Sequence, residues 1–210
     1  MKRVVFIFIL IVQQGFSQIE FRNDESLLFD QQTVYGTSVL GPSISFFDFD
    51  QDGWDDITVP ASATRDFRFF KNVEGTFEEI NLGISSNNIQ ARHVIWVDFD
   101  NDGDYDFFAT SDLGHLWLYR NEGDASFTDI TDTSGLPSVT FPYWGSSWGD
   151  YNNDGHLDVF ISVRDANQEQ GNLLFQGNGD GTFINTTLEA GIDTAGYITF
   201  CSSFFDYDND

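Results

Sequence analysis

Short apolar runs alternate with polar segments rich in Asp, Asn and Gly along most of the chain. The runs consist mainly of aromatic and β-branched residues, their length is typical of strands, and no window sustains the periodicity of a helix. The runs that precede the acidic segments are Ile44–Phe47, Val94–Val97, Trp144–Trp148 and Phe200–Phe205, and those that follow are Ile57–Val59, Phe107–Ala109 and Val159–Val163. This pattern predicts an all-β protein.

The same order of segments recurs at a spacing of about 50 residues. Acidic segments begin at Asp48, Asp98, Asp150 and Asp206, so the successive spacings are 50, 52 and 56 residues. Each complete unit also has a third apolar run, and then a turn containing Gly before a last run. That turn supplies the positive φ angles of a tight hairpin. Four short antiparallel strands per unit are the pattern of a β-propeller blade.

We therefore expect an incomplete β-propeller of four-stranded antiparallel blades, with about three full blades and partial ones. The expected units are about 40–85, 86–135, 136–190 and, in part, 191–210. A β-sandwich and a β-helix are the alternatives. A sandwich does not require the same loop at the same point of every unit, and a β-helix has a much shorter repeat.

The first residues have the order of a secretory signal. Met1-Lys-Arg is followed by the apolar run Val4–Val12 and by small residues up to Ser17, so we expect residues 1–17 to be a signal peptide and residues 18–210 to be exported. No other stretch approaches the ~20 apolar residues of a membrane-spanning helix. These features predict a secreted or surface-exposed protein without a transmembrane segment in this sequence.

The chain is strongly acidic, with a formal net charge of -25. Such a charge repels the phosphates of nucleic acids, and we expect no nucleic-acid partner. Acidic chains with few aromatic residues are often disordered, but 17% of these residues are aromatic and 23 are Phe, which is enough apolar surface for a core. The only cysteine, Cys201, excludes a disulfide within the chain, and we expect it to be buried as a small hydrophobic residue.

The acidic segments share the form D-x-[DN]-x-D-G-x-x-D. Alternating acids on a sharply turned backbone offer the oxygen ligands that Ca²⁺ prefers, with side-chain oxygens from positions 1, 3, 5 and 9 and a carbonyl from position 7. The predicted ligands are Asp48, Asp50, Asp52, Trp54 and Asp56; Asp98, Asp100, Asp102, Asp104 and Asp106; Asp150, Asn152, Asp154, His156 and Asp158; and Asp206, Asp208 and Asp210 of a fourth loop that begins near the end of the sequence. We expect one Ca²⁺ per complete loop, and a structural role for it.

Other cation sites fit the loops less well. An EF-hand places an acid at position 12, where this chain has Val59, Ala109 and Ile161. Magnesium requires a stricter octahedral geometry, and zinc requires Cys or clustered His, which these loops lack.

These loops, together with the Leu118-Tyr-Arg-Asn121 type of strand and the Gly179-Asp-Gly-Thr-Phe183 type of turn, resemble the FG-GAP/VCBS repeats of integrin α-like propellers. The resemblance covers roughly residues 40–210. The literal Phe-Gly and Gly-Ala-Pro signatures are absent, so the VCBS branch is the closer match, with Trp148-Gly149 as the nearest equivalent. The resemblance implies a calcium-binding propeller of a secreted or surface protein that serves adhesion or recognition.

Two classes of function remain. The first is a non-catalytic adhesion or recognition scaffold whose partner is an extracellular protein or glycan. The second is the propeller domain of an extracellular polysaccharide-acting enzyme such as a lyase, for which Arg92-His93 together with Arg120 is the only hint. The sequence contains no Gly-x-Ser-x-Gly elbow and no phosphate-binding Gly loop, and we assign no catalytic residue.

Overall fold

The computed structural model describes residues 43–124, 126–137, 141–165, 167, 170–192 and 198–206. All of them belong to one compact unit, Thr33–Asp210. The signal peptide predicted at residues 1–17 lies outside the described residues. Within the described ranges the structure has twelve strands and one 3-10 helix, η1 (Thr131–Thr133). The predicted all-β class is confirmed.

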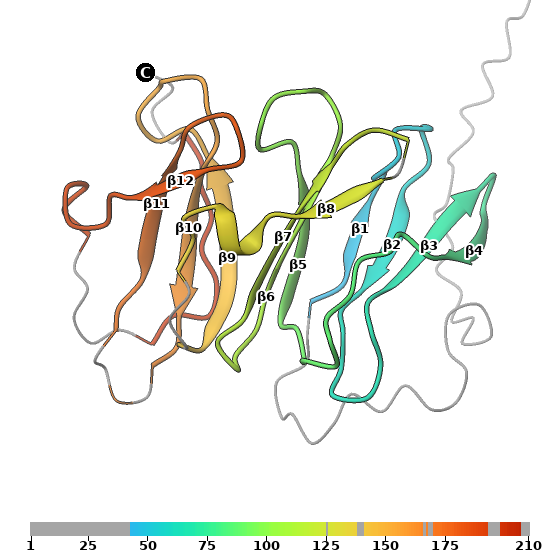
Figure 1. The fold of residues 1–210 in the computed structure, drawn as a ribbon, viewed down its shortest axis with the longest axis horizontal. Helices are drawn as coiled ribbons and strands as arrows, with labels where there is room; N and C mark the ends of the chain where they lie inside the picture. The colour runs from blue at the N-terminus through green and yellow to red at the C-terminus, as the bar shows by residue number, and fades with distance from the viewer. Residues whose placement is uncertain are drawn as a thin grey trace, which may run out of the picture. The chain divides into compact units, whose positions relative to one another are not determined.

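The strands form three antiparallel sheets of four strands each, and each sheet takes its strands in chain order (Figure 1). The first sheet consists of β1 (Ser45–Phe47), β2 (Asp56–Val59), β3 (Arg68–Val73) and β4 (Thr76–Ile80). The second consists of β5 (His93–Val97), β6 (Asp106–Thr110), β7 (Leu116–Asn121) and β8 (Phe127–Asp129). The third consists of β9 (Tyr143–Gly149), β10 (Asp158–Val163), β11 (Leu173–Gly177) and β12 (Phe183–Asn185).

Each acidic loop joins the first and second strands of its sheet. The last acid of each loop is the first residue of the second strand, so Phe47 pairs with Asp56, Val97 with Asp106 and Gly149 with Asp158. The four-stranded unit predicted from the repeat is therefore present three times, with the loop at the same place in each sheet.

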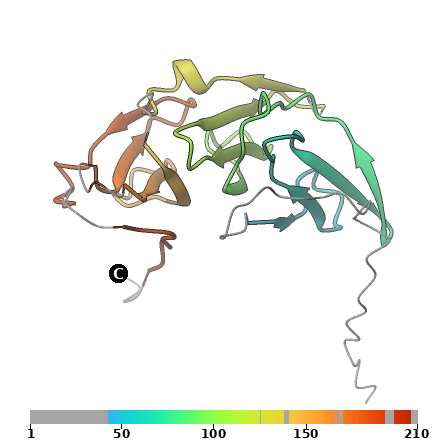
Figure 2. The same ribbon diagram turned by 90° about the horizontal axis from the view of Figure 1, so that it is seen from below.

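Neighbouring sheets lie side by side, with β5 next to both β1 and β9 (Figure 2). One core cluster, which includes Phe69, Trp96 and Phe107, fills the space between the first and second sheets. Another, which includes Phe99, Tyr143 and Phe175, fills the space between the second and third sheets. Because both faces of the middle sheet are covered, β6 is buried at every position.

Two expectations about the end of the described chain are wrong. Residues 198–206 contain no strand, although the run Phe200–Phe205 resembles the first strands of the other units. In the three sheets the first strand pairs only with the second, and no strand among the described residues pairs with residues 198–206. Cys201 is exposed rather than buried. Among the described residues, no helix has the length and apolar composition needed to span a bilayer.

Candidate metal sites

The first acid of each loop fixes the backbone of the turn. The Asp48 carboxylate accepts hydrogen bonds from the backbone N–H of Asp52 (3.0 Å) and of Gly53 (2.8 Å). The turn also needs left-handed backbone at positions 4 and 6, where Gln51 has φ 60° and Gly53 has φ 95°. Glycine adopts that conformation without strain, which explains why position 6 is glycine. Asp98 and Asp150 accept the corresponding pairs of bonds, at 2.8–3.1 Å.

The last acid of each loop is a buried acceptor at the base of the loop. Asp56 is 0% exposed and accepts the N–H of Phe49 at 3.1 Å and that of Asn72 in β3 at 2.8 Å. Asp106 accepts the equivalent bonds from Phe99 and Asn121, and Asp158 accepts them from Tyr151 and Gly177. This carboxylate therefore ties the start of the loop to the third strand of the sheet.

Burial makes the charged form of this acid unfavourable. It raises the pKa of Asp56 to about 6 and that of Asp106 to about 8, and it also raises the pKa of Asp158. The two backbone N–H donors lower each pKa and the neighbouring loop carboxylates raise it, but burial has the largest effect. A cation among these carboxylates would favour the ionised form.

Two of the three complete loops bring carboxylates together closely enough to hold a metal ion. Oxygen atoms of Asp48, Asp50 and Asp56 lie within 4.8 Å of one another. The same holds for Asp98, Asp100 and Asp106. Such an all-oxygen set suits a hard divalent cation.

A buried oxygen in the second loop also fits a cation. Asp100 Oδ1 is buried and has no hydrogen-bond partner among the described residues. Burial raises the pKa of Asp100, and the carboxylate of Asp102 raises it further. A bound cation would both pair this oxygen and offset the repulsion between the two acids.

The third loop has an amide where the other two have an acid. Asn152 accepts the N–H of Asp154 at 3.1 Å and donates its own amide to the Asp154 carboxylate at 2.9 Å. Its side-chain oxygen has a second lone pair, which could serve a cation as a neutral ligand. Asp206, the first acid of the predicted fourth loop, is exposed, while Asp208 and Asp210 lie outside the described residues.

The other predicted ligand positions lie within the turn itself. At position 5, Asp52 accepts the N–H of Trp54 at 3.0 Å, and Asp102 accepts that of Asp104 at 2.9 Å. In the third loop Asp154 accepts the N–H of His156, also at 2.9 Å. Each position-5 acid thus holds the residue whose carbonyl was predicted as a ligand.

The residue on the third strand that faces each loop was missed by the sequence analysis. Lys71 of β3 bonds the carboxylate of Asp50 and lies 3.0 Å from that of Asp52. In the third sheet Gln176 donates to Asp154 at 2.8 Å, whereas Arg120 in the second sheet turns to Glu122 at 2.8 Å. Their common sequence position could have indicated them. Each of the three residues immediately precedes the third-strand residue whose N–H is accepted by the buried last acid of the loop.

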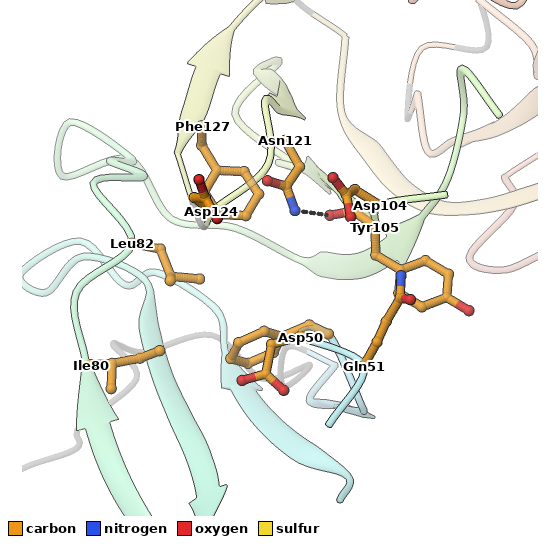
Figure 3. Close-up of a pocket in the computed structure, with 10 residues that line it drawn as sticks. Asp50, Gln51, Ile80, Leu82, Asp104, Tyr105, Asn121, Asp124 and Phe127 are labelled. Atoms are coloured by element: carbon orange, nitrogen blue, oxygen red, sulfur yellow. Dashed lines mark hydrogen bonds between the residues drawn. The ribbon is translucent and has the colours of Figure 1, made fainter. Parts of the chain in front are cut away.

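A cavity of about 230 Å³ lies beside the first loop, between the first two sheets (Figure 3). Its wall is apolar where Phe49, Leu82 and Phe127 line it, and acidic where Asp50 and Asp104 line it. Residues of both the first loop and the second loop therefore line this cavity.

The sequence matches the FG-GAP-like repeat family twice, at residues 48–109 and 98–161. The chain is also 32% identical over 59 residues to Cartilage acidic protein 1 of Xenopus tropicalis, a match that covers 28% of this chain and 9% of that protein. This chain thus corresponds to only a small part of that relative. The repeats together cover residues 48 to 161, more than half of the chain, and each begins at the first acid of a loop. The chain therefore belongs to the FG-GAP-like repeat family.

Proposed function

We propose that each complete acidic loop binds one Ca²⁺ and that the ion stabilises the sheet whose first two strands the loop joins. The observation that carries this proposal is the convergence of three carboxylates within 4.8 Å in each of the first two loops. Ca²⁺ takes 6–8 oxygen ligands in flexible geometry, and each loop offers side-chain oxygens from positions 1, 3, 5 and 9 with a carbonyl from position 7. The proposed ligands are those predicted from the sequence.

Calcium fits these loops better than magnesium does. Their carboxylates already accept several backbone N–H groups, so a cation meets oxygens whose positions are partly fixed by the turn. Mg²⁺ requires a near-ideal octahedron and retains its waters, and so it gains less from such a set.

We infer that the three sheets are consecutive blades of a propeller, with units of about 40–85, 86–135 and 136–190 and a partial unit at 191–210. The family assignment and the side-by-side packing of β1, β5 and β9 support this arrangement. We also propose that residues 1–17 are a signal peptide and that residues 18–210 belong to the propeller.

The function that these features support best is a secreted or surface-exposed calcium-binding scaffold for adhesion or recognition of an extracellular protein or glycan. The repeat family and the signal-like start of the sequence support it. The match to a relative that is named for cartilage is in keeping with an extracellular setting.

No contact among the described residues favours the enzyme alternative. Arg92 bonds the backbone of Thr110 at one end of the second sheet, whereas Arg120 stands near its other end, close to the acidic loop. Each guanidinium is also paired with an acid, Asp112 or Glu122. These two residues therefore do not form one site.

Calcium binding is tested by thermal unfolding and by isothermal titration of the chain with Ca²⁺, Mg²⁺ or a chelator. We expect Ca²⁺ to raise the unfolding temperature more than Mg²⁺ does, because a ligand that binds only the folded state stabilises it. Identical unfolding curves with Ca²⁺ and with chelator would refute the proposed calcium binding. A glycan array probed with and without Ca²⁺ then tests recognition, and turnover of uronic polymers at catalytic rates would restore the enzyme alternative.

A further inference from the structure

Side-chain amides connect each acidic loop to the next one along the chain. Gln51 Nε2 of the first loop donates to the carbonyl oxygen of Gly103 in the second at 2.5 Å. Asn101 Nδ2 of the second loop donates to the carbonyl oxygen of Gly155 in the third at 3.0 Å. In both cases the donor occupies position 4 and the acceptor position 6. Figure 3 shows the Gln51 side chain extending from the first loop toward the Asp104–Tyr105 segment of the second.

The donor reaches its partner because its own loop is folded. Gln51 and Asn101 both have φ 60°, the left-handed conformation that the turn requires at position 4. The first acid of each loop holds its turn, since Asp48 accepts the N–H of Asp52 in the first loop and Asp98 accepts that of Asp102 in the second. A loop that loses this conformation also loses the direction of its amide.

The acceptor stands next to a proposed ligand atom. The carbonyl of Gly103 immediately precedes Asp104, whose carbonyl is the position-7 ligand of the second loop. The N–H of Gly103 is bonded to the Asp98 carboxylate at 3.1 Å. Gly103 is therefore held on one side by its own loop and on the other by the preceding loop.

A second contact repeats at the same junction. The aromatic residue at position 2 of the first and second loops stacks on a tryptophan of the next sheet: Phe49 on Trp96, with ring centroids 4.8 Å apart, and Phe99 on Trp148, with centroids 6.4 Å apart. The backbone around positions 2 to 4 thus meets a fixed surface of the following sheet. This stacking fixes the backbone that carries the position-4 amide against the following sheet.

We propose that the position-4 amides couple neighbouring calcium loops, so that binding of the ion at one loop raises the affinity of the adjacent loop. This inference rests on the proposed calcium binding. The coupling is reciprocal by linkage, so the first loop binds Ca²⁺ more tightly when the second loop is also able to bind it. One hydrogen bond of ordinary net strength corresponds to a roughly 2- to 10-fold change in affinity.

The experiment uses Tb³⁺ as the probe, because Trp54 at position 7 of the first loop can sensitise the luminescence of an ion bound there. The affinity of the first loop is measured in the wild type, in Gln51→Gly, in Asp102→Ala and in the double variant. Glycine removes the amide and tolerates the positive φ angle. Asp102→Ala impairs the second loop at an exposed residue, so no buried group loses its partner.

We expect Asp102→Ala to lower the Tb³⁺ affinity of the first loop roughly 2- to 10-fold when Gln51 is present. In the Gln51→Gly background the same substitution should leave that affinity unchanged. Gln51→Asn should retain part of the coupling, as Asn101 does in the second loop. The matched control is Asn153→Gly, at the same position with φ 59°, because that side chain makes no hydrogen bond among the described residues. It should change nothing at the first loop.

An equal effect of Asp102→Ala with and without the Gln51 amide would overturn the coupling while leaving calcium binding intact. Absence of a Trp54-sensitised signal in the wild type, together with unfolding that Ca²⁺ does not shift, would instead remove the proposed function and the coupling with it.

Discussion

Replacing Asp56 by Ala is predicted to destabilise the chain far more than replacing its neighbour Asp55 in the same way. Asp56 is 0% exposed and its carboxylate accepts two buried backbone N–H groups, those of Phe49 and Asn72. The side chain of Asp55 is exposed and makes no hydrogen bond among the described residues. The two variants remove the same atoms one residue apart, so their difference isolates the buried acceptor.

The size of the effect follows from the two N–H groups. A buried donor left without a partner costs about 1–3 kcal/mol, so Asp56→Ala should cost ~2–6 kcal/mol. The lower half of that range is expected, because burial already raises the pKa of Asp56 to about 6 and its removal relieves that penalty. Asp56→Asn keeps one acceptor oxygen and should cost ~1–3 kcal/mol. Asp55→Ala should remain within ~0.5 kcal/mol of the wild type.

Urea unfolding in the presence of chelator measures these differences without a contribution from the metal. The slope of free energy against urea should be unchanged, so that the shift in midpoint reports stability. With Ca²⁺ in excess, Asp55→Ala should keep the full calcium-induced shift, whereas Asp56→Asn should lose the part due to the first loop. Equal midpoints for Asp56→Ala and Asp55→Ala would refute the assignment of Asp56 as a buried acceptor of two backbone N–H groups.

Three further substitutions test contacts around the loops and between the sheets. Lys71→Gln should raise the calcium affinity of the first loop, because the ammonium that bonds Asp52 at 3.0 Å no longer competes with the ion; an unchanged or weaker isotherm would contradict this. Burial lowers the pKa of His93 from 6.5 to about 4. The neutral imidazole therefore contributes to the free energy of unfolding above pH ~6.5, and up to ~3 kcal/mol of that contribution is lost as pH falls to 4. Urea midpoints of His93→Gln should therefore fall less steeply over that range than those of the wild type, and parallel curves would speak against it. Thr58→Val should cost ~1–3 kcal/mol because it leaves the indole N–H of Trp96 buried without its 2.9 Å partner, whereas Thr58→Ser should cost less than half as much.

The sheets could be predicted because the information for them is local. An apolar run on each side of a rigid acidic turn specifies a hairpin, and repetition of that order specifies the sheet. Asp56 was predicted as a ligand from its position in the loop, and the structure adds that it is also the acceptor for two backbone N–H groups. The run Phe200–Phe205 shows the limit of local reasoning, because a strand forms only where a partner strand is available.

Polar contacts between residues that lie far apart in the sequence could not be predicted in the same way. Gln51 and Lys71 are polar residues on a polar loop and an alternating strand, and nothing in their local pattern distinguishes them from solvated side chains. Their roles depend on which loop or strand is packed opposite, 52 residues away for the Gln51 amide. The repeat itself carries the only usable signal, since an amide side chain recurs at position 4 of all three complete loops.

Position 7 explains how such similar loops can still differ at the surface. Its proposed ligand atom is a backbone carbonyl, so its side chain is not constrained by the ion, and it is Trp54, Asp104 and His156 in the three loops. Trp54 is 46% exposed. His156 instead lies against the last hairpin of its sheet, where a Cβ at Gly179 would stand 2.3 Å from its Nδ1 atom. The backbone geometry proposed to bind the ion can therefore stay the same in every repeat while position 7 varies, and this separation of the proposed ion site from surface chemistry suits the proposed recognition scaffold.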